Sequence, residues 1–338
     1  MRRMRVLLLA LLAGTTGCPN KIDKVTTKRI LPAAILRGDI VETCHMGLSV
    51  SPVVAALGTS KRSPDKALMV TEVAGAICAL TRAHEANLDE ARLRSLFQGQ
   101  ASALSTLTDA RIEKERAHTD AARRFGAVWS RFQKVYPLSG ETCPKLRQDE
   151  EAVYVVGVLS GLLAVLHDGM GGRNAGISQD AVLHAGRAAQ CLSDERWWGL
   201  PEAMNHAGWA SIPGSGPEGV DPWAELVRIS DAASTQGMRL PAALYVTIAA
   251  NAGHTDKVKT AIGKASESFH SVPSIERWRL LDALAQLLLV HESDLVWFAE
   301  EGHRTEYFGT FPRTEEEMDA NNENPFTEEA DPFASDEE

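Results

Sequence analysis

Apolar residues recur at intervals of three and four along almost the whole stretch from Leu31 to about Val296. Such spacing is typical of helices that bury one face, and no sustained alternation of the β-strand type interrupts it. The pattern therefore predicts an all-α fold, with antiparallel helix pairs arranged as one array or bundle of the α-solenoid kind.

Local start and stop signals set the expected bounds of the helices. Ser63 and Asp221 each precede a proline, which is favoured at the first helical position, and Asn87 with Glu90 resembles a capping box. Gly253 indicates a stop. The expected helices cover 31–47, 64–86, 88–98, 103–135, 148–168, 179–192, 194–209, 222–236, 241–252, 256–268, 275–291 and 294–301.

One of these helices is apolar on nearly every side. Val153 to Leu166 carries only apolar and small residues and includes Gly157 and Gly161, where a neighbouring backbone could approach closely. A membrane span needs about 20 apolar residues, and this run is shorter and ends at His167 and Asp168. We therefore expect the central helix of a soluble core, with Asp168 at its end.

Residues 245–265 carry the one repeat-like signal in the helical region. Gly253 lies at a turn, and Val258, Ile262 and Ala265 follow at small and apolar positions. This stretch resembles a single tetratricopeptide unit. The resemblance implies a helix-pair architecture and identifies no functional family.

The N-terminus has the composition of an export signal. Residues 2–5 include three arginines, residues 6–13 are apolar, and small residues then lead to Cys18. This arrangement resembles a bacterial lipoprotein signal, which implies cleavage after residue 17 and acylation of Cys18 by palmitate-type chains. An ordinary secretory leader is the alternative, although no small-x-small cleavage site lies cleanly between Ala13 and Cys18.

The resemblance to lipoproteins also implies where in the cell envelope the protein lies. Several acyl chains hold a protein stably on a bilayer, whereas one does not. Residues 18–30 are then a lipidated tether, and a proline rather than an aspartate at position 19 implies sorting to the outer membrane, facing the periplasm. The expected partners are the membrane, through the anchor, and another protein of the cell envelope.

Four further cysteines, an even number, fall in a chain expected to reach an oxidising compartment. They are Cys44, Cys78, Cys143 and Cys191. Three connectivities are open, and we favour pairing of neighbours, Cys44 with Cys78 and Cys143 with Cys191. Four buried free thiols are the alternative.

Charge is distributed unevenly. The formal net charge is −10, but residues 314–338 hold eleven acidic residues and no lysine or arginine, so the preceding chain is close to neutral. We expect a helical domain at 31–313, a disordered acidic tail at 314–338 and no nucleic-acid partner. The tail repeats an aromatic after proline at Phe326 and Phe333, which is either a docking motif or part of a solubilising segment.

The chain contains parts of several catalytic and cofactor-binding motifs, and none of these motifs is complete. Cys44-His45 is the second half of a haem attachment motif, but Val41 stands where that motif needs its first cysteine. His167-Asp168 lacks the further ligands of metal phosphohydrolases. Glu292-Ser293 resembles the start of the motif of helical lipoproteins that cleave peptidoglycan, without its continuation, and Ser293 is better interpreted as a helix cap. We expect no enzyme, no cofactor and no metal.

Tryptophan is concentrated between residues 197 and 223. Trp197, Trp198, Trp209 and Trp223 form either a packed corner of the core or an aromatic pocket for a peptide, sugar or other apolar ligand. Such a pocket would have residues 194–196 at its edge.

These features together predict a lipid-anchored, non-enzymatic protein-interaction module of the cell envelope, because helical arrays offer a long concave face to partners. A ligand-binding accessory of a transport system, with a small-molecule ligand, is the alternative. A cell-wall-active enzyme is the third hypothesis.

Overall fold

The computed structural model describes residues 19–58, 63–97, 99–138 and 142–312. The signal peptide expected at 1–17, Cys18 and the tail expected at 314–338 lie outside these residues. The described residues form helices and no β-strand, so the predicted all-α class is confirmed.

The helices follow one another with short connections. They are α2 (Pro19–Val25), α3 (Leu31–Arg37), α4 (Ile40–Ala56), α5 (Asp65–Leu96), α6 (Leu104–Val135), α7 (Glu151–Met170), α8 (Asp180–Ala189), α9 (Leu200–Ser211), α10 (Pro222–Ser234), α11 (Leu240–Asn251), α12 (Thr255–Ser271) and α13 (Arg279–Glu300). Single turns precede three of them: η1 (Thr26–Ile30), η2 (Ala101–Ala103) and η3 (Glu276–Trp278).

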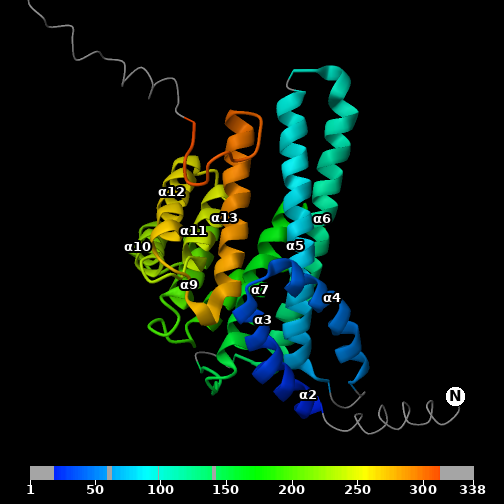
Figure 1. The fold of residues 1–338 in the computed structure, drawn as a ribbon, viewed down its shortest axis with the longest axis vertical. Coiled ribbons are helices and arrows are strands. Elements are labelled where there is room, and N and C mark those ends of the chain that lie inside the picture. Colours follow the sequence, from blue (N-terminus) through cyan, green and yellow to red (C-terminus); the bar gives the residue numbers. More distant parts are fainter. Residues whose placement is uncertain (1–18, 59–62, 98, 139–141, 313–338) are drawn as a thin grey trace, which may run out of the picture.

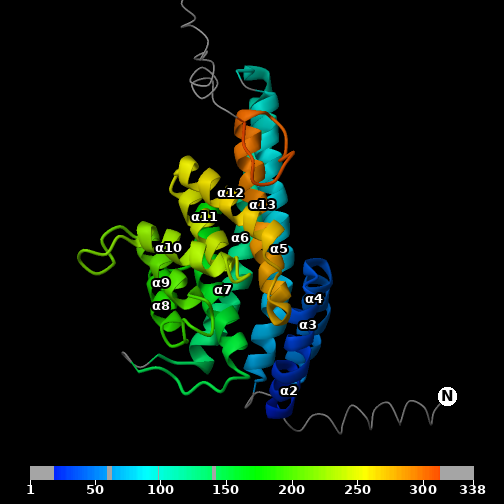
Figure 2. The ribbon, with the colours of Figure 1, turned by 60° about the vertical axis from the view of Figure 1, so that its left-hand side comes forward.

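The helices lie in three groups. Helices α5, α6, α7 and α13 run roughly parallel or antiparallel to the long axis, α3 and α4 cover one side of them, and α8–α12 form a compact group on the other (Figures 1 and 2). One continuous apolar core joins the bundle to the α8–α12 group.

Helix α7 is the central helix that its composition predicts. It is long and apolar enough to cross a membrane, but 72% of its most apolar window is buried inside the protein. A Cβ atom on Gly157 would lie 2.3 Å from the Phe132 ring, and one on Gly161 would lie 2.8 Å from the Trp129 ring. These glycines therefore admit aromatic rings of α6 rather than a neighbouring backbone.

The segment expected to be a tether is helical. From Pro19 the chain forms α2, η1 and α3, and it then bends at Gly38, whose φ of +67° favours glycine. Asp39 caps α4 by accepting a hydrogen bond from the backbone N–H of Glu42 at 2.8 Å. One expected helix at 31–47 is therefore two, and we call residues 19–56 the N-terminal arm.

Two predicted helix breaks are wrong, and both for the same reason. Asn87 lies in the middle of the 32-residue helix α5, and Ser293 lies inside the 22-residue helix α13. Both side chains are buried and make tertiary contacts instead of capping: Asn87 contacts His291, and the Ser293 hydroxyl contacts that of Thr305. Polar residues that favour caps are tolerated inside a helix when another element satisfies them.

Both favoured cysteine pairs are joined in the structure. Cys44 of α4 is bonded to Cys78 of α5, and Cys143 is bonded to Cys191, just after α8. One turn from the first bond, a Cβ on Gly47 would lie 2.0 Å from the Gly75 nitrogen. The arm is therefore held against α5 by a covalent bond and by backbone contact.

Alkylation with an iodoacetamide reagent tests this pairing. In protein purified from an oxidising compartment and unfolded without reductant, we expect Cys44, Cys78, Cys143 and Cys191 to remain unmodified, because each is in a disulfide. Reductant should expose all four, and peptide mapping of the unreduced protein should recover the two predicted linked pairs. Labelling before reduction, or peptides that join Cys44 to Cys143 or Cys191, would contradict the structure.

The repeat-like stretch forms a helix pair. Helices α11 and α12 enclose the predicted turn, with Gly253 at a φ of +78°. However, α11 also contacts α9, α10 and α13, and α13 runs back to α3 and α5. The α8–α12 helices thus close into a compact group, and a continued tetratricopeptide-like array is not confirmed.

Candidate functional sites

The four tryptophans of the predicted aromatic pocket pack against different partners. The Trp197 ring packs at a tilt against that of Trp278, with 4.6 Å between ring centroids, and its N–H donates a hydrogen bond to Glu151. The Arg277 guanidinium lies 5.5 Å from the centre of the Trp198 ring. The remaining contacts are Trp209 with His206 at 4.8 Å and Trp223 with His254 at 5.0 Å. Trp197 is buried and the other three tryptophans are partly exposed. A shared aromatic pocket stays a prediction.

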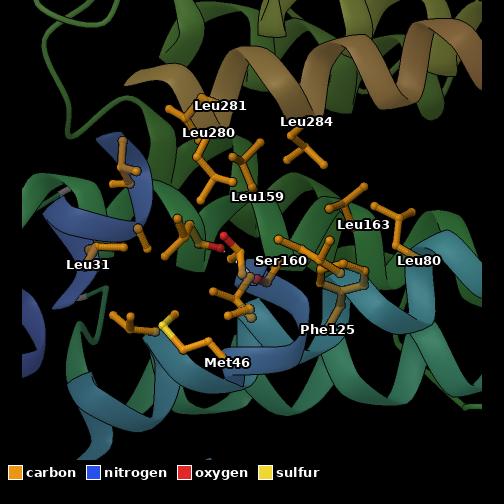
Figure 3. A pocket seen from close by; sticks show the side chains of 18 residues that line it. Leu31, Met46, Leu80, Phe125, Leu159, Ser160, Leu163, Leu280, Leu281 and Leu284 are labelled. Atoms are coloured by element: carbon orange, nitrogen blue, oxygen red, sulfur yellow. Dashed lines mark hydrogen bonds between the residues drawn. The ribbon is translucent and has the colours of Figure 1, made fainter. Parts of the chain in front are cut away.

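A small apolar cavity separates the arm from the bundle. Side chains of α3, α4, α5, α6, α7 and α13 line it, among them Leu31, Met46, Phe125, Leu159 and Leu281 (Figure 3). The Ser160 hydroxyl beside it donates to the Val156 carbonyl at 2.7 Å and is therefore satisfied. The volume of about 60 Å³ is smaller than the roughly 150 Å³ that admits benzene. The cavity as it stands holds no ligand of metabolite size.

Four buried histidines meet in the bundle, one from each of its four helices. They are His84 of α5, His118 of α6, His167 of α7 and His291 of α13. The His118 and His167 Nδ1 atoms are 2.8 Å apart, and the His84 and His291 rings stack with centroids 3.8 Å apart. The His84 and His167 centroids are 6.3 Å apart, so the two pairs adjoin. We call these four residues the histidine cluster.

Burial keeps the cluster uncharged. It lowers the pKa of His118 to about 4, with a further contribution from Lys114, and that of His291 to about 3, with contributions from His118, His167 and Arg304. Burial and the neighbouring rings also lower the pKa values of His84 and His167 well below the usual value. At neutral pH all four imidazoles are neutral, the form in which histidine binds metals.

No local sequence motif links the members of the histidine cluster, so motifs alone do not predict it. A relation along the chain was nevertheless present. The midpoint between His84 and His118 falls at residue 101, in the turn between α5 and α6, and the midpoint between His118 and His167 falls in the connection between α6 and α7. Residues equidistant from a hairpin turn face each other, so these spacings place three histidines at one level of an antiparallel bundle.

One trio among the described residues brings three possible ligand atoms within 4.8 Å of one another: Glu202, His206 and Glu225. The positively charged side chain of Arg228 already lies between the two carboxylates. The Arg228 guanidinium donates to Glu202 and to Glu225, each at 2.7 Å. An ion would have to displace this guanidinium, so the trio is better explained as an ion-pair network between α9 and α10.

Glu292, the acid of the cell-wall enzyme hypothesis, is buried within α13. Burial raises its pKa to about 8, so the carboxyl is mostly protonated at neutral pH. His167 joins the histidine cluster, whereas its neighbour Asp168 accepts hydrogen bonds from the backbone of Ala175 and Ile177 at 2.7 and 2.8 Å. Asp168 therefore shapes the loop after α7, which ends at Met170, two residues beyond the predicted end.

Exposed large apolar side chains gather at the two ends of the molecule. Five of the nine in the described residues lie on the N-terminal arm: Val25, Leu36, Val41, Leu48 and Val53. Leu96 and Leu104, exposed by 59% and 69%, flank the turn between α5 and α6. Figure 1 places that turn at the end of the long axis opposite to the arm. We call residues 92–108 the hairpin tip.

Comparison of the chain with protein-family models, with curated proteins and with solved structures gave no match.

Proposed function

We propose that this protein is a lipid-anchored interaction module of the cell envelope, which stands on a membrane by its N-terminal arm and binds a protein partner through its hairpin tip. The observation that carries the proposal is the position of the exposed apolar side chains at opposite ends of one elongated bundle. Large exposed apolar groups cost solubility and gather at interaction surfaces.

The arm suits a membrane surface. It begins at residue 19, directly after the cysteine of the lipoprotein-like signal, and its exposed apolar residues are accompanied by Lys21, Lys24, Lys28 and Arg29, all exposed. Each cation near an anionic surface contributes about 1 kcal/mol of binding free energy. The disulfide between α4 and α5 would transmit this attachment to the bundle.

The hairpin tip suits a protein partner. Helices α5 and α6 extend beyond the rest of the bundle (Figures 1 and 2). Charged side chains surround the two leucines: Arg92 and Arg94 on α5, and Asp109 and Arg111 on α6. An apolar centre with a polar rim is the usual composition of a protein–protein interface.

Site-specific photocrosslinking in the native host tests this function. A benzophenone amino acid at position 96 or 104 should capture the same envelope protein, because both positions face one partner. Position 307 is the matched control: Tyr307 is exposed by 65% and lies outside the tip. Leu96→Glu with Leu104→Glu should abolish copurification of that partner from solubilised membranes while the protein stays folded and membrane-bound.

The proposal fails if positions 96 and 104 yield no common adduct or yield the adduct seen at position 307. It fails equally if the charged double variant still retains the partner, or if the protein fractionates without the membrane.

A further inference from the structure

The histidine cluster leaves four ring nitrogens unsatisfied in the protein interior. They are His84 Nδ1, His118 Nε2, His167 Nε2 and His291 Nδ1. All four side chains are more than nine-tenths buried. A buried polar group without a partner costs about 1–3 kcal/mol of folding free energy, and four in one place are rare in proteins. An ion bound to His84 Nδ1 would remove that cost at His84. In His118 and His167 the Nδ1 atoms face each other, and the unpartnered atoms are the two Nε2 atoms.

The distances within the cluster resemble those around one metal ion. Two nitrogens bound to a tetrahedral ion at 2.0–2.1 Å are about 3.3 Å apart. The His118 and His167 Nδ1 atoms share a hydrogen bond at 2.8 Å, and an ion between them would replace the shared proton and move the two atoms slightly apart. Imidazoles on a tetrahedral ion have ring centroids about 5 Å apart, by the same bond lengths. The His118 and His167 centroids are 5.1 Å apart.

The stacked pair supplies one further ligand. At 3.8 Å the His84 and His291 rings are too close to bind one ion side by side. His84 lies nearer to the first pair, with its centroid 6.3 Å from that of His167, and we expect it to move toward the ion on binding. His291 stacks on His84 and contacts Asn87 at 3.3 Å between its Nε2 atom and the amide nitrogen. Such outer contacts orient metal ligands.

The structure assigns to His84, His118 and His167 a site for one divalent transition-metal ion of the kind that prefers imidazole, such as Zn²⁺, Cu²⁺ or Ni²⁺. Three neutral imidazoles leave a fourth coordination position for water or for a second ligand. All the proposed protein ligands are imidazoles. The trio of Glu202, His206 and Glu225 differs, because two of its three possible ligands are carboxylates.

A surface cleft reaches a residue that contacts the cluster. A cleft of about 430 Å³ lies between α5, α6 and α13, and Asn87, which contacts His291, lines it. Glu90 also lines the cleft and forms ion pairs with Lys114 and Arg94. An ion entering here would pass a carboxylate before it reached the imidazoles.

Titration of the full mature chain without a polyhistidine tag tests the site. After treatment with EDTA the protein should bind one equivalent of Zn²⁺ in calorimetry, and Co²⁺ should give the intense visible absorption of a tetrahedral nitrogen-ligated ion. His118→Gln and His167→Gln should each weaken Zn²⁺ binding at least 100-fold. His206→Gln and His45→Gln, which alter histidines outside the cluster, should leave it unchanged.

X-ray absorption of the Zn²⁺-loaded wild-type protein keeps the test decisive if a glutamine variant misfolds, because it counts imidazole ligands directly. Two or three imidazoles on the ion support the site. The assignment is overturned if no stoichiometric ion binds, if fewer than two imidazoles are found, or if folded His118→Gln and His167→Gln variants retain wild-type affinity. Loss of binding in His206→Gln with retention in the cluster variants also overturns it, in favour of the Glu202 trio.

Discussion

The metal-free protein should lose most of its stability between pH 6.5 and pH 4. The unfolded chain binds protons on its histidines near pH 6.5, whereas burial holds the pKa of His118 at about 4 and that of His291 at about 3 in the folded state. Acid therefore favours the unfolded state, and the loss begins as the pH falls below 6.5. The shift of His118 alone is worth on the order of 3 kcal/mol by pH 4, against a total stability of about 5–15 kcal/mol.

One neighbour has the opposite effect. The pKa of Glu292 is raised to about 8, so the folded state holds that proton more tightly and gains stability as the pH falls from 8 toward 4.5. Below pH 6.5 the destabilisation from the four histidines is larger than the stabilisation from Glu292. Below pH 4.5 the stabilisation from Glu292 no longer grows. Lys114 lowers the pKa of His118 and Arg304 lowers that of His291, so both side chains disfavour protonation of the cluster.

Urea unfolding with EDTA present, at pH values from 8 to 4, measures this dependence. His118→Gln should reduce the acid-induced loss by about 3 kcal/mol, because one proton-binding site of the unfolded chain is gone. The exposed His45→Gln is the control and should follow the wild type. A wild-type protein that is equally stable at pH 6.5 and pH 4 would show that the histidines are not buried as described.

Local patterns predicted most of the helices, because each helix has an apolar face that repeats at three and four residues. Helix α6 agrees with its prediction to within one residue at its start. The pairing of Cys44 with Cys78 was also predictable, since neighbouring cysteines on consecutive helices meet across one hairpin. The contacts between helices that are distant in the sequence could not be predicted in this way. Asn87 and Ser293 have the chemistry of caps, and only the neighbouring helices explain why they lie inside helices.

The candidate sites were harder to predict than the fold for the same reason. Four tryptophans close in sequence suggested a shared pocket, yet their partners differ. Trp197 and Trp198 contact residues of η3, and Trp223 contacts His254, whereas Trp209 packs on His206 of its own helix. His291 is separated from His84 by 207 residues and stacks on it. A single sequence shows where apolar residues recur at helical spacing. Which polar residues of different helices lie at the same height in the bundle depends on the lengths of the connections between the helices.

Replacement of Arg239 by methionine should cost about 3–5 kcal/mol of folding free energy. Its guanidinium is fully buried, donates to the Ser268 carbonyl near the end of α12 at 2.7 Å, and pairs with Asp282 of α13 at 3.0 Å. The residue precedes α11 directly, so one side chain links three helices. Without it the Asp282 carboxylate is left buried without its countercharge, which is the costly part.

A double variant separates this effect from lost packing. In Arg239→Met with Asp282→Leu neither charge of the pair is buried, so we expect the double variant to recover about half of the loss. The rest remains because the Val272 carbonyl still lacks its guanidinium donor. Arg82→Met is the surface control: Arg82 pairs with Glu113 at 3.0 Å, but both side chains are more than half exposed, and such pairs contribute about 0–1 kcal/mol. Urea unfolding at pH 7.5 measures all three. Two results would contradict this account: a loss below about 1 kcal/mol in Arg239→Met, or a double variant that is less stable than Arg239→Met. Either would show that the Asp282 carboxylate does not depend on the guanidinium for its countercharge.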